Sequence, residues 1–172
     1  MVSKLDKTRS LEVFLSYAKE DQATVRKIYK QLMSEKELLL SPWLDTYKLI
    51  PGQDWKLEIN LAIEKSDAVI VFFSNMAVQK EGYVQNELRK IKEVERNKPE
   101  RANFVTPVLL DECEIPTDYS KWQWVEYKDK DWYKSLLLSL KERAKFLGLK
   151  NVPSKMYKII LTLDMDYSDV ND

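Results

Sequence analysis

The sequence predicts an α/β fold: a flavodoxin-like parallel five-stranded sheet of order 2-1-3-4-5, flanked by helices. Strand-like segments alternate with helix-like segments along the chain, which is typical of a parallel sheet with right-handed crossovers. Residues 68–73 (Ala-Val-Ile-Val-Phe-Phe) are continuously apolar, as expected for a central strand covered on both faces. Pro42 has no N–H to donate to a sheet ladder, so its strand belongs at an edge, as this order requires.

Two strands and one helix are predicted before residue 45. Residues 11–16 form a short strand, and residues 38–44 form the edge strand that contains Pro42. Between them, apolar side chains recur at helical spacing, which predicts an amphipathic helix with Asp21 as its N-cap. The apolar side chains of this helix are Val25, Ile28, Tyr29, Leu32 and Met33.

A long loop and a second helix follow the edge strand. Residues 45–54 contain a Pro-Gly turn and show no periodicity, so we expect an exposed loop. The helix begins at Trp55, with Asp54 as its N-cap, and ends near Ser66. We expect the Trp55 side chain to pack in the core.

The second half of the chain continues the alternation of helices and strands. After the central strand, a helix begins near Gly82. Residues 104–110 predict the fourth strand, and residues 124–127 predict a short fifth strand. Apolar spacing in residues 132–147 predicts a last helix, which Gly148 ends.

We divide the chain into an N-terminal extension (residues 1–10), one domain (residues 11–149) and a tail (residues 150–172). From Tyr157 to Tyr167 the tail alternates apolar and mostly polar residues, which predicts an amphipathic strand. It is either an extra edge strand or the first strand of a further domain. We favour the second interpretation because a strand with an apolar face needs a partner.

The composition argues against several classes of function. Lys and Arg together number 28 and so do Asp and Glu, so no excess of positive charge is available to bind nucleic acid. Cys113 is the only cysteine, which excludes an internal disulfide and a cysteine-cluster metal site. Residues 1–9 lack the apolar core of a signal peptide, and no apolar run approaches the length of a membrane span. We therefore expect a cytoplasmic protein that binds neither nucleic acid nor membrane.

Two absences restrict the chemistry further. The chain has no histidine, which removes the commonest general base, the triads that depend on it and the usual zinc ligand. It has three glycines, Gly52, Gly82 and Gly148, and their spacing allows neither the dinucleotide fingerprint nor the phosphate loop. An enzyme built from this chain relies on carboxylates, hydroxyls and aromatic rings, and we predict no metal site and no cofactor.

Glu87 is the residue that most needs an explanation. On its predicted helix it falls within the apolar stripe of Leu88 and Ile91, where a carboxylate is costly unless it is paired or used. One explanation is a glutamate near the helix start that the helix dipole stabilises. The other is a functional site, because ligands in such folds bind beyond the carboxyl ends of strands one and three. Residues 16–21 and 74–83 meet at that point.

Several short segments follow one another in an order that is found in a known family. They are residues 13–21 (Val-Phe-Leu-Ser-Tyr-Ala-Lys-Glu-Asp), 43–45 (Trp-Leu-Asp), 51–55 (Pro-Gly-Gln-Asp-Trp), 62–74 (Ala-Ile-Glu-Lys-Ser-Asp-Ala-Val-Ile-Val-Phe-Phe-Ser), 86–88 (Asn-Glu-Leu), 107–110 (Pro-Val-Leu-Leu) and 115–116 (Ile-Pro). In this order they resemble the Toll/interleukin receptor (TIR) domain, and most closely its bacterial members. The resemblance covers residues 11–147.

The resemblance implies an enzyme whose substrate is NAD+. Many TIR domains cleave the bond between nicotinamide and ribose, releasing nicotinamide and either ADP-ribose or a cyclic isomer, and their essential glutamate corresponds to Glu87. This chemistry suits a chain without histidine, because nicotinamide leaves as a neutral molecule and needs no general acid. A single carboxylate can stabilise the oxocarbenium-like centre that remains.

The resemblance also implies substrate-binding positions at Ser16, Tyr17, Lys19, Asp45, Ser74 and Tyr83. The first three would line the ribose and phosphate side of the substrate, the alternative being an ordinary solvated turn. Tyr83 would stack on the nucleotide or pack in the core. Asp45 would order the long loop, and Ser74 would bond the ribose or cap the end of its strand.

TIR domains also assemble through the long loop, which here presents Lys48, Leu49 and Ile50. The resemblance therefore implies a homo-oligomer, a role in bacterial anti-phage defence, and a further C-terminal domain or effector as partner. A non-catalytic adaptor that acts through TIR–TIR contacts is the main alternative. A nucleoside deoxyribosyltransferase shares the fold type and an attacking glutamate, but it ranks lower because the Trp-Leu-Asp and Ser-Asp-Ala-Val-Ile segments indicate a TIR domain.

Overall fold

The computed structural model describes residues 9–79, 83–99 and 103–150, with the backbone alone for residues 46, 47 and 83–85. The strand predicted in the tail and most of the predicted N-terminal extension lie outside the described residues. In the part described, no helix is both long enough and apolar enough to cross a membrane.

Five parallel strands form one sheet in the order β2-β1-β3-β4-β5, which confirms the predicted topology. The strands are β1 (Leu11–Ser16), β2 (Leu40–Trp43), β3 (Ala68–Phe73), β4 (Val105–Leu109) and β5 (Val125–Glu126). All six residues of β3 are buried, as expected for the centre of the sheet. Pro42 lies in the edge strand β2, and this strand is shorter than the predicted residues 38–44.

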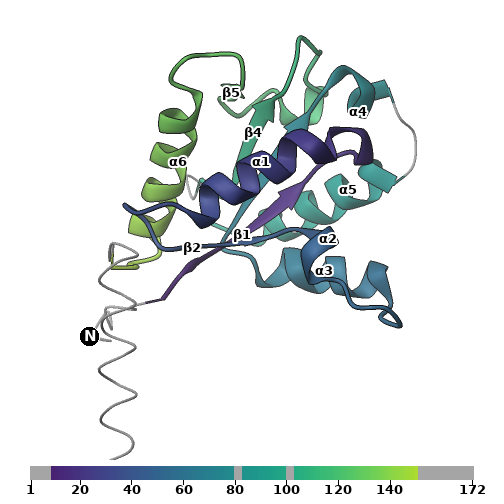
Figure 1. Ribbon diagram of the computed structural model, residues 1–172, viewed down its shortest axis with the longest axis horizontal. Coiled ribbons are helices and arrows are strands. Elements are labelled where there is room, and N and C mark those ends of the chain that lie inside the picture. The colour runs from purple at the N-terminus through teal and green to yellow at the C-terminus, as the bar shows by residue number, and fades with distance from the viewer. Residues whose placement is uncertain (1–8, 80–82, 100–102, 151–172) are drawn as a thin grey trace, which may run out of the picture.

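In the described part of the chain, four long helices cover the sheet, two on each face (Figure 1). Apolar residues of α1 (Gln22–Met33) and α6 (Trp132–Phe146) join one core cluster with Leu11, Val13 and Leu15 of β1. Apolar residues of α3 (Trp55–Lys65) and α5 (Tyr83–Arg96) join the other cluster with Phe14 of the same strand. Alternate residues of β1 therefore face opposite helix layers, as the pleat of a strand requires.

The predicted helix ends are partly confirmed. The Asp54 carboxylate accepts hydrogen bonds from the backbone N–H groups of Lys56 (3.1 Å) and Leu57 (3.2 Å), so it caps α3 as expected. Gly148, with a φ of 68°, follows the end of α6. Asp21 is the N-cap residue of α1, but its side chain makes no capping hydrogen bond.

The described residues also form four short helices: η1 (Lys19–Asp21), α2 (Asp45–Lys48), α4 (Asn75–Gln79) and η2 (Thr117–Tyr119). The segment predicted as an irregular loop at residues 45–54 therefore begins with a helix, and this part of the prediction was wrong. One turn of helix is too short to give a detectable period, because amphipathic spacing needs several turns.

Two predicted core side chains are exposed. Trp55 retains 44% of its accessible surface and Met33 retains 54%. Each is the terminal residue of its helix, the first of α3 and the last of α1. Helical spacing identifies a face of a helix but does not show how far along the helix that face is covered.

Candidate functional site

The carboxyl ends of β1 and β3 lie side by side at the switch point of the sheet, where Ser16 pairs with Val71. Ser16 is the last residue of β1, and Ser74 directly follows β3. Both serines are 1% exposed. The chain continues from these two ends into η1 and α4, which contact each other, so the two segments meet at the switch point as the sequence predicts.

Glu87 lies on α5 with its side chain 7% exposed, and it is the fifth residue of that helix. Its neighbours on the apolar stripe, Leu88 and Ile91, are buried against the sheet. The Ser16 hydroxyl donates to Glu87 Oε2 at 2.8 Å, which joins α5 to the end of β1. A position beyond the first turn weakens the explanation by helix dipole, because that effect fades after the first turn.

Tyr17 connects the same end of β1 to the long loop. Its side chain is 7% exposed and packs in the core cluster of α1 and α6. Its hydroxyl donates to Asp45 Oδ1 at 2.5 Å, and Asp45 is the first residue of α2. This contact joins the end of β1 to the start of the long loop, and the role of Asp45 in ordering that loop remains a prediction.

Ser74 joins two loops at the carboxyl edge of the sheet. Its hydroxyl donates to Asp21 Oδ2 at 2.7 Å and accepts from the Ala77 N–H at 3.1 Å, at the start of α4. Asp111, which follows β4, accepts from the Asn75 N–H at 2.8 Å. Ser74 therefore joins the end of β3 to η1 and to the start of α4, and its predicted role in binding the ribose remains a prediction.

Asp21 and Asp111 were not among the predicted site residues. Burial is the largest influence on Asp21 and raises the pKa of its carboxyl; the Ser74 hydroxyl opposes this shift, and the negative charges of Asp111 and Glu20 add to it. Asp21 follows β1 and Asp111 follows β4, each beyond the carboxyl end of its strand. Their position after a strand could have marked them as candidate site residues.

The remaining predicted residues differ in their exposure. Lys19 is exposed on η1. Tyr83 is the first residue of α5, and its side chain lies outside what the structure describes. In the long loop Lys48 is exposed, Leu49 is half-buried and Ile50 is 66% exposed.

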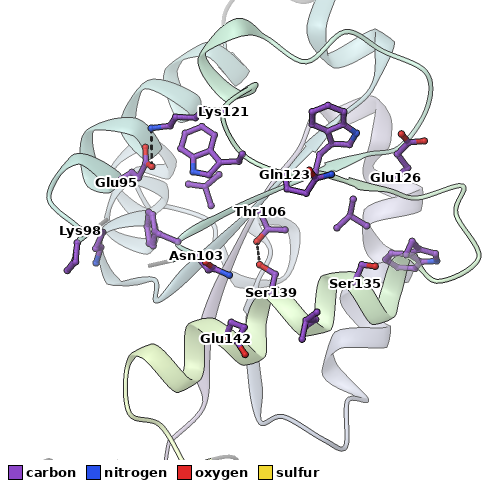
Figure 2. A pocket seen from close by; sticks show the side chains of 18 of the residues that line it. Glu95, Lys98, Asn103, Thr106, Lys121, Gln123, Glu126, Ser135, Ser139 and Glu142 are labelled. Atoms are coloured by element: carbon purple, nitrogen blue, oxygen red, sulfur yellow. Dashed lines mark hydrogen bonds and ion pairs between the residues drawn. The ribbon is translucent and has the colours of Figure 1, made fainter. Parts of the chain in front are cut away.

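A cavity of 900 Å³ lies at the other side of the sheet, between β4, β5 and α6 (Figure 2). On its wall Thr106 and Ser139 share a hydrogen bond of 2.8 Å, and Lys121 forms an ion pair with Glu95. None of the predicted site residues lines this cavity. Within the described ranges, no cluster of three or more His, Cys, Asp or Glu is arranged to hold a metal ion.

Comparison with known proteins identifies the family. The family model of the TIR domain matches residues 13–138, which is more than half of the chain. A sequence search of curated proteins finds no match. Solved structures with the same fold include the TIR domain of the Toll-related receptor TRR-2 from Hydra magnipapillata, with 20% identity and a TM-score of 0.56 over 77% of this chain and 99% of the other.

Two further solved structures share the fold. A TIR-STING receptor from C. gigas, in complex with 2′,3′-cGAMP, has 17% identity and a TM-score of 0.61 over 76% of this chain and 39% of that protein. The TIR domains of the activated Roq1 resistosome have 21% identity and a TM-score of 0.51 over 83% of this chain and 86% of theirs. The likeness to these structures establishes the fold, and the family model adds the sequence match, so this chain belongs to the TIR domain family.

Proposed function

We propose that this TIR domain is an NAD+ glycohydrolase or cyclase that cleaves the bond between nicotinamide and ribose. The observation that carries the proposal is the carboxylate of Glu87, which is 7% exposed and bonded to Ser16 at the carboxyl ends of the central strands. A buried carboxylate needs a function or a compensating partner, and this one lies where ligands bind in folds of this topology.

The chemistry requires one anion and no general acid. As the bond between C1′ of the ribose and the nicotinamide nitrogen breaks, its electron pair moves to the nitrogen and neutralises the charge of the ring. The positive charge that develops on the ribose is stabilised by the Glu87 carboxylate. Attack by water then gives ADP-ribose and a proton, whereas attack by a nitrogen of the adenine gives a cyclic isomer.

The test is nicotinamide release from NAD+ at high protein concentration, with Glu87→Gln compared with the wild type. We expect the variant to lose at least roughly 100-fold in kcat, because its amide carries no charge. Glu93→Gln is the matched control, since Glu93 lies on the same helix with an exposed side chain that pairs with Lys90. Circular dichroism is used to check that both variants are folded.

Full activity in Glu87→Gln would refute the assignment of Glu87, and wild-type protein that releases no nicotinamide, even when crowded, would refute the enzymatic function. Parallel incubation with deoxynucleosides separates the deoxyribosyltransferase alternative, which would consume them and leave NAD+ intact. Family resemblance supports a setting in bacterial anti-phage defence within the cytoplasm, and a phage plaque assay with Glu87→Gln tests that setting.

A non-catalytic adaptor is the second candidate function, and exposed apolar surface around the long loop favours it. Ile50 is 66% exposed, and Trp55 and Leu57 on the adjoining helix are 44% and 53% exposed. Such a surface suits self-association with further TIR domains. Sedimentation of the wild type beside Ile50→Asp tests it: we expect the aspartate to reduce association, and unchanged association would remove this surface from the proposal.

A further inference from the structure

The hydroxyl of Ser16 is buried and directed at a single carboxylate. Ser16 is 1% exposed at the end of β1, and its Oγ lies 2.8 Å from Oε2 of Glu87. Ser16 and Val71 are paired in the centre of the sheet, so the backbone that carries this hydroxyl is held by the ladder between β1 and β3. The donor is therefore fixed in space more firmly than a donor on a loop would be.

A glutamate needs such a contact in order to present its carboxylate in one orientation. The last torsion of a glutamate side chain is broad, so rotamer preference alone leaves the plane of the carboxylate undefined. A hydrogen bond to one oxygen selects one orientation of that plane. With Oε2 held by Ser16, the direction of the other oxygen is also set.

The same bond compensates in part for the burial of the Glu87 carboxylate. Burial opposes ionisation of a carboxyl group, whereas a hydrogen bond donated to the carboxylate supports it. With Glu87 only 7% exposed, the contribution of water to the stability of the charge is small, and a buried hydroxyl donor replaces part of it.

We propose, on the basis of the NAD+-cleaving function above, that Ser16 is a positioning residue that orients the Glu87 carboxylate toward the ribose and does not itself bind the substrate. This role differs from the substrate-binding role that the family resemblance implies for Ser16. The orientation matters mainly in the transition state, because the carboxylate stabilises charge that develops as the glycosidic bond breaks.

Three substitutions at this position separate donor chemistry from packing. Ser16→Ala removes the donor, and Ser16→Cys keeps a similar volume with a much weaker donor. Ser16→Thr keeps the hydroxyl and suits a strand. Ser66→Ala is the matched control: Ser66 is 4% exposed and its hydroxyl donates to the Ile63 carbonyl at 2.7 Å, at the opposite end of the sheet.

The measurements are kcat and KM for nicotinamide release at one pH, with circular dichroism on each variant. We expect kcat to fall roughly 10- to 100-fold in Ser16→Ala and Ser16→Cys, the range for losing one hydrogen bond to a charged group, with KM unchanged. Ser16→Thr should recover most of the rate.

Other outcomes would overturn the proposal. A raised KM with unchanged kcat would make Ser16 a substrate-binding residue. Wild-type rates in both Ser16→Ala and Ser16→Cys would show that the Ser16 hydroxyl does not orient Glu87. An inactive wild type would refute the NAD+-cleaving function and the positioning role with it. That last result is distinguishable from the others, since in them the wild type remains active.

Discussion

The hydrogen bond between Tyr17 and Asp45 predicts how firmly the long loop is attached to the sheet. Replacing Tyr17 with phenylalanine removes the hydroxyl that lies 2.5 Å from Asp45 Oδ1 and keeps the buried ring. A hydrogen bond to a charged group contributes roughly 1.5–3 kcal/mol, and Asp45 is only half-buried, so we expect a loss of about 1.5 kcal/mol.

This loss should act locally, on α2. A helix of four residues does not form by itself, so α2 depends on contacts such as this one. About 1.5 kcal/mol corresponds to a roughly tenfold increase in the population of the open form. Amide hydrogen exchange at residues 48–50 should therefore become roughly tenfold faster in Tyr17→Phe, while exchange in β3 changes much less.

Tyr133→Phe provides the matched control for this prediction. The Tyr133 hydroxyl donates to Glu35 Oε2 at 2.7 Å, so the same chemistry is removed from a different part of the fold. Exchange at residues 48–50 should stay at the wild-type rate in this variant. Equal rates in Tyr17→Phe and the wild type, or equal acceleration by both variants, would refute the reasoning that this bond holds α2.

Two further predictions concern titrating groups near the carboxyl edge of the sheet. Burial raises the pKa of Asp21 above its ordinary value of 3.8, so the folded state holds this proton more tightly and loses stability as the pH rises through the folded pKa. Asp21→Asn should therefore make the free energy of unfolding, measured with urea, less dependent on pH above 3.8. An unchanged pH dependence in this variant would contradict the prediction. Burial, with added repulsion from Asp111 and Asp21, raises the pKa of the Cys113 thiol to about 11, so alkylation by iodoacetamide at pH 8 should be much slower than for free cysteine; a rate equal to that of free cysteine would contradict this.

The sheet could be predicted from the sequence because its signals are local and strong. The apolar run of β3 indicates a strand covered on both sides, and Pro42 indicates an edge. The burial of Glu87 also follows from local information, since its helical phase places it beside Leu88.

Side-chain partners within the site could not be predicted in the same way. Ser16 bonds to Glu87, whereas Ser74 bonds to Asp21. This choice of partners depends on where each strand ends relative to the neighbouring helices, and no short sequence pattern encodes that position. The helices α2 and α4 were missed because four or five residues contain too little periodicity. The roles of the predicted residues in binding NAD+ remain predictions.

The alternation of Ser16 and Tyr17 has a consequence for the evolution of the family. These consecutive residues face opposite helix layers, one toward Glu87 and the other toward Asp45. Because side chains in a strand alternate, an insertion or deletion of one residue within β1 would exchange the two directions and break both contacts at once. Homologues that keep both contacts should therefore vary in the length of residues 49–54 while the length of β1 stays constant, a pattern that an alignment of relatives can test.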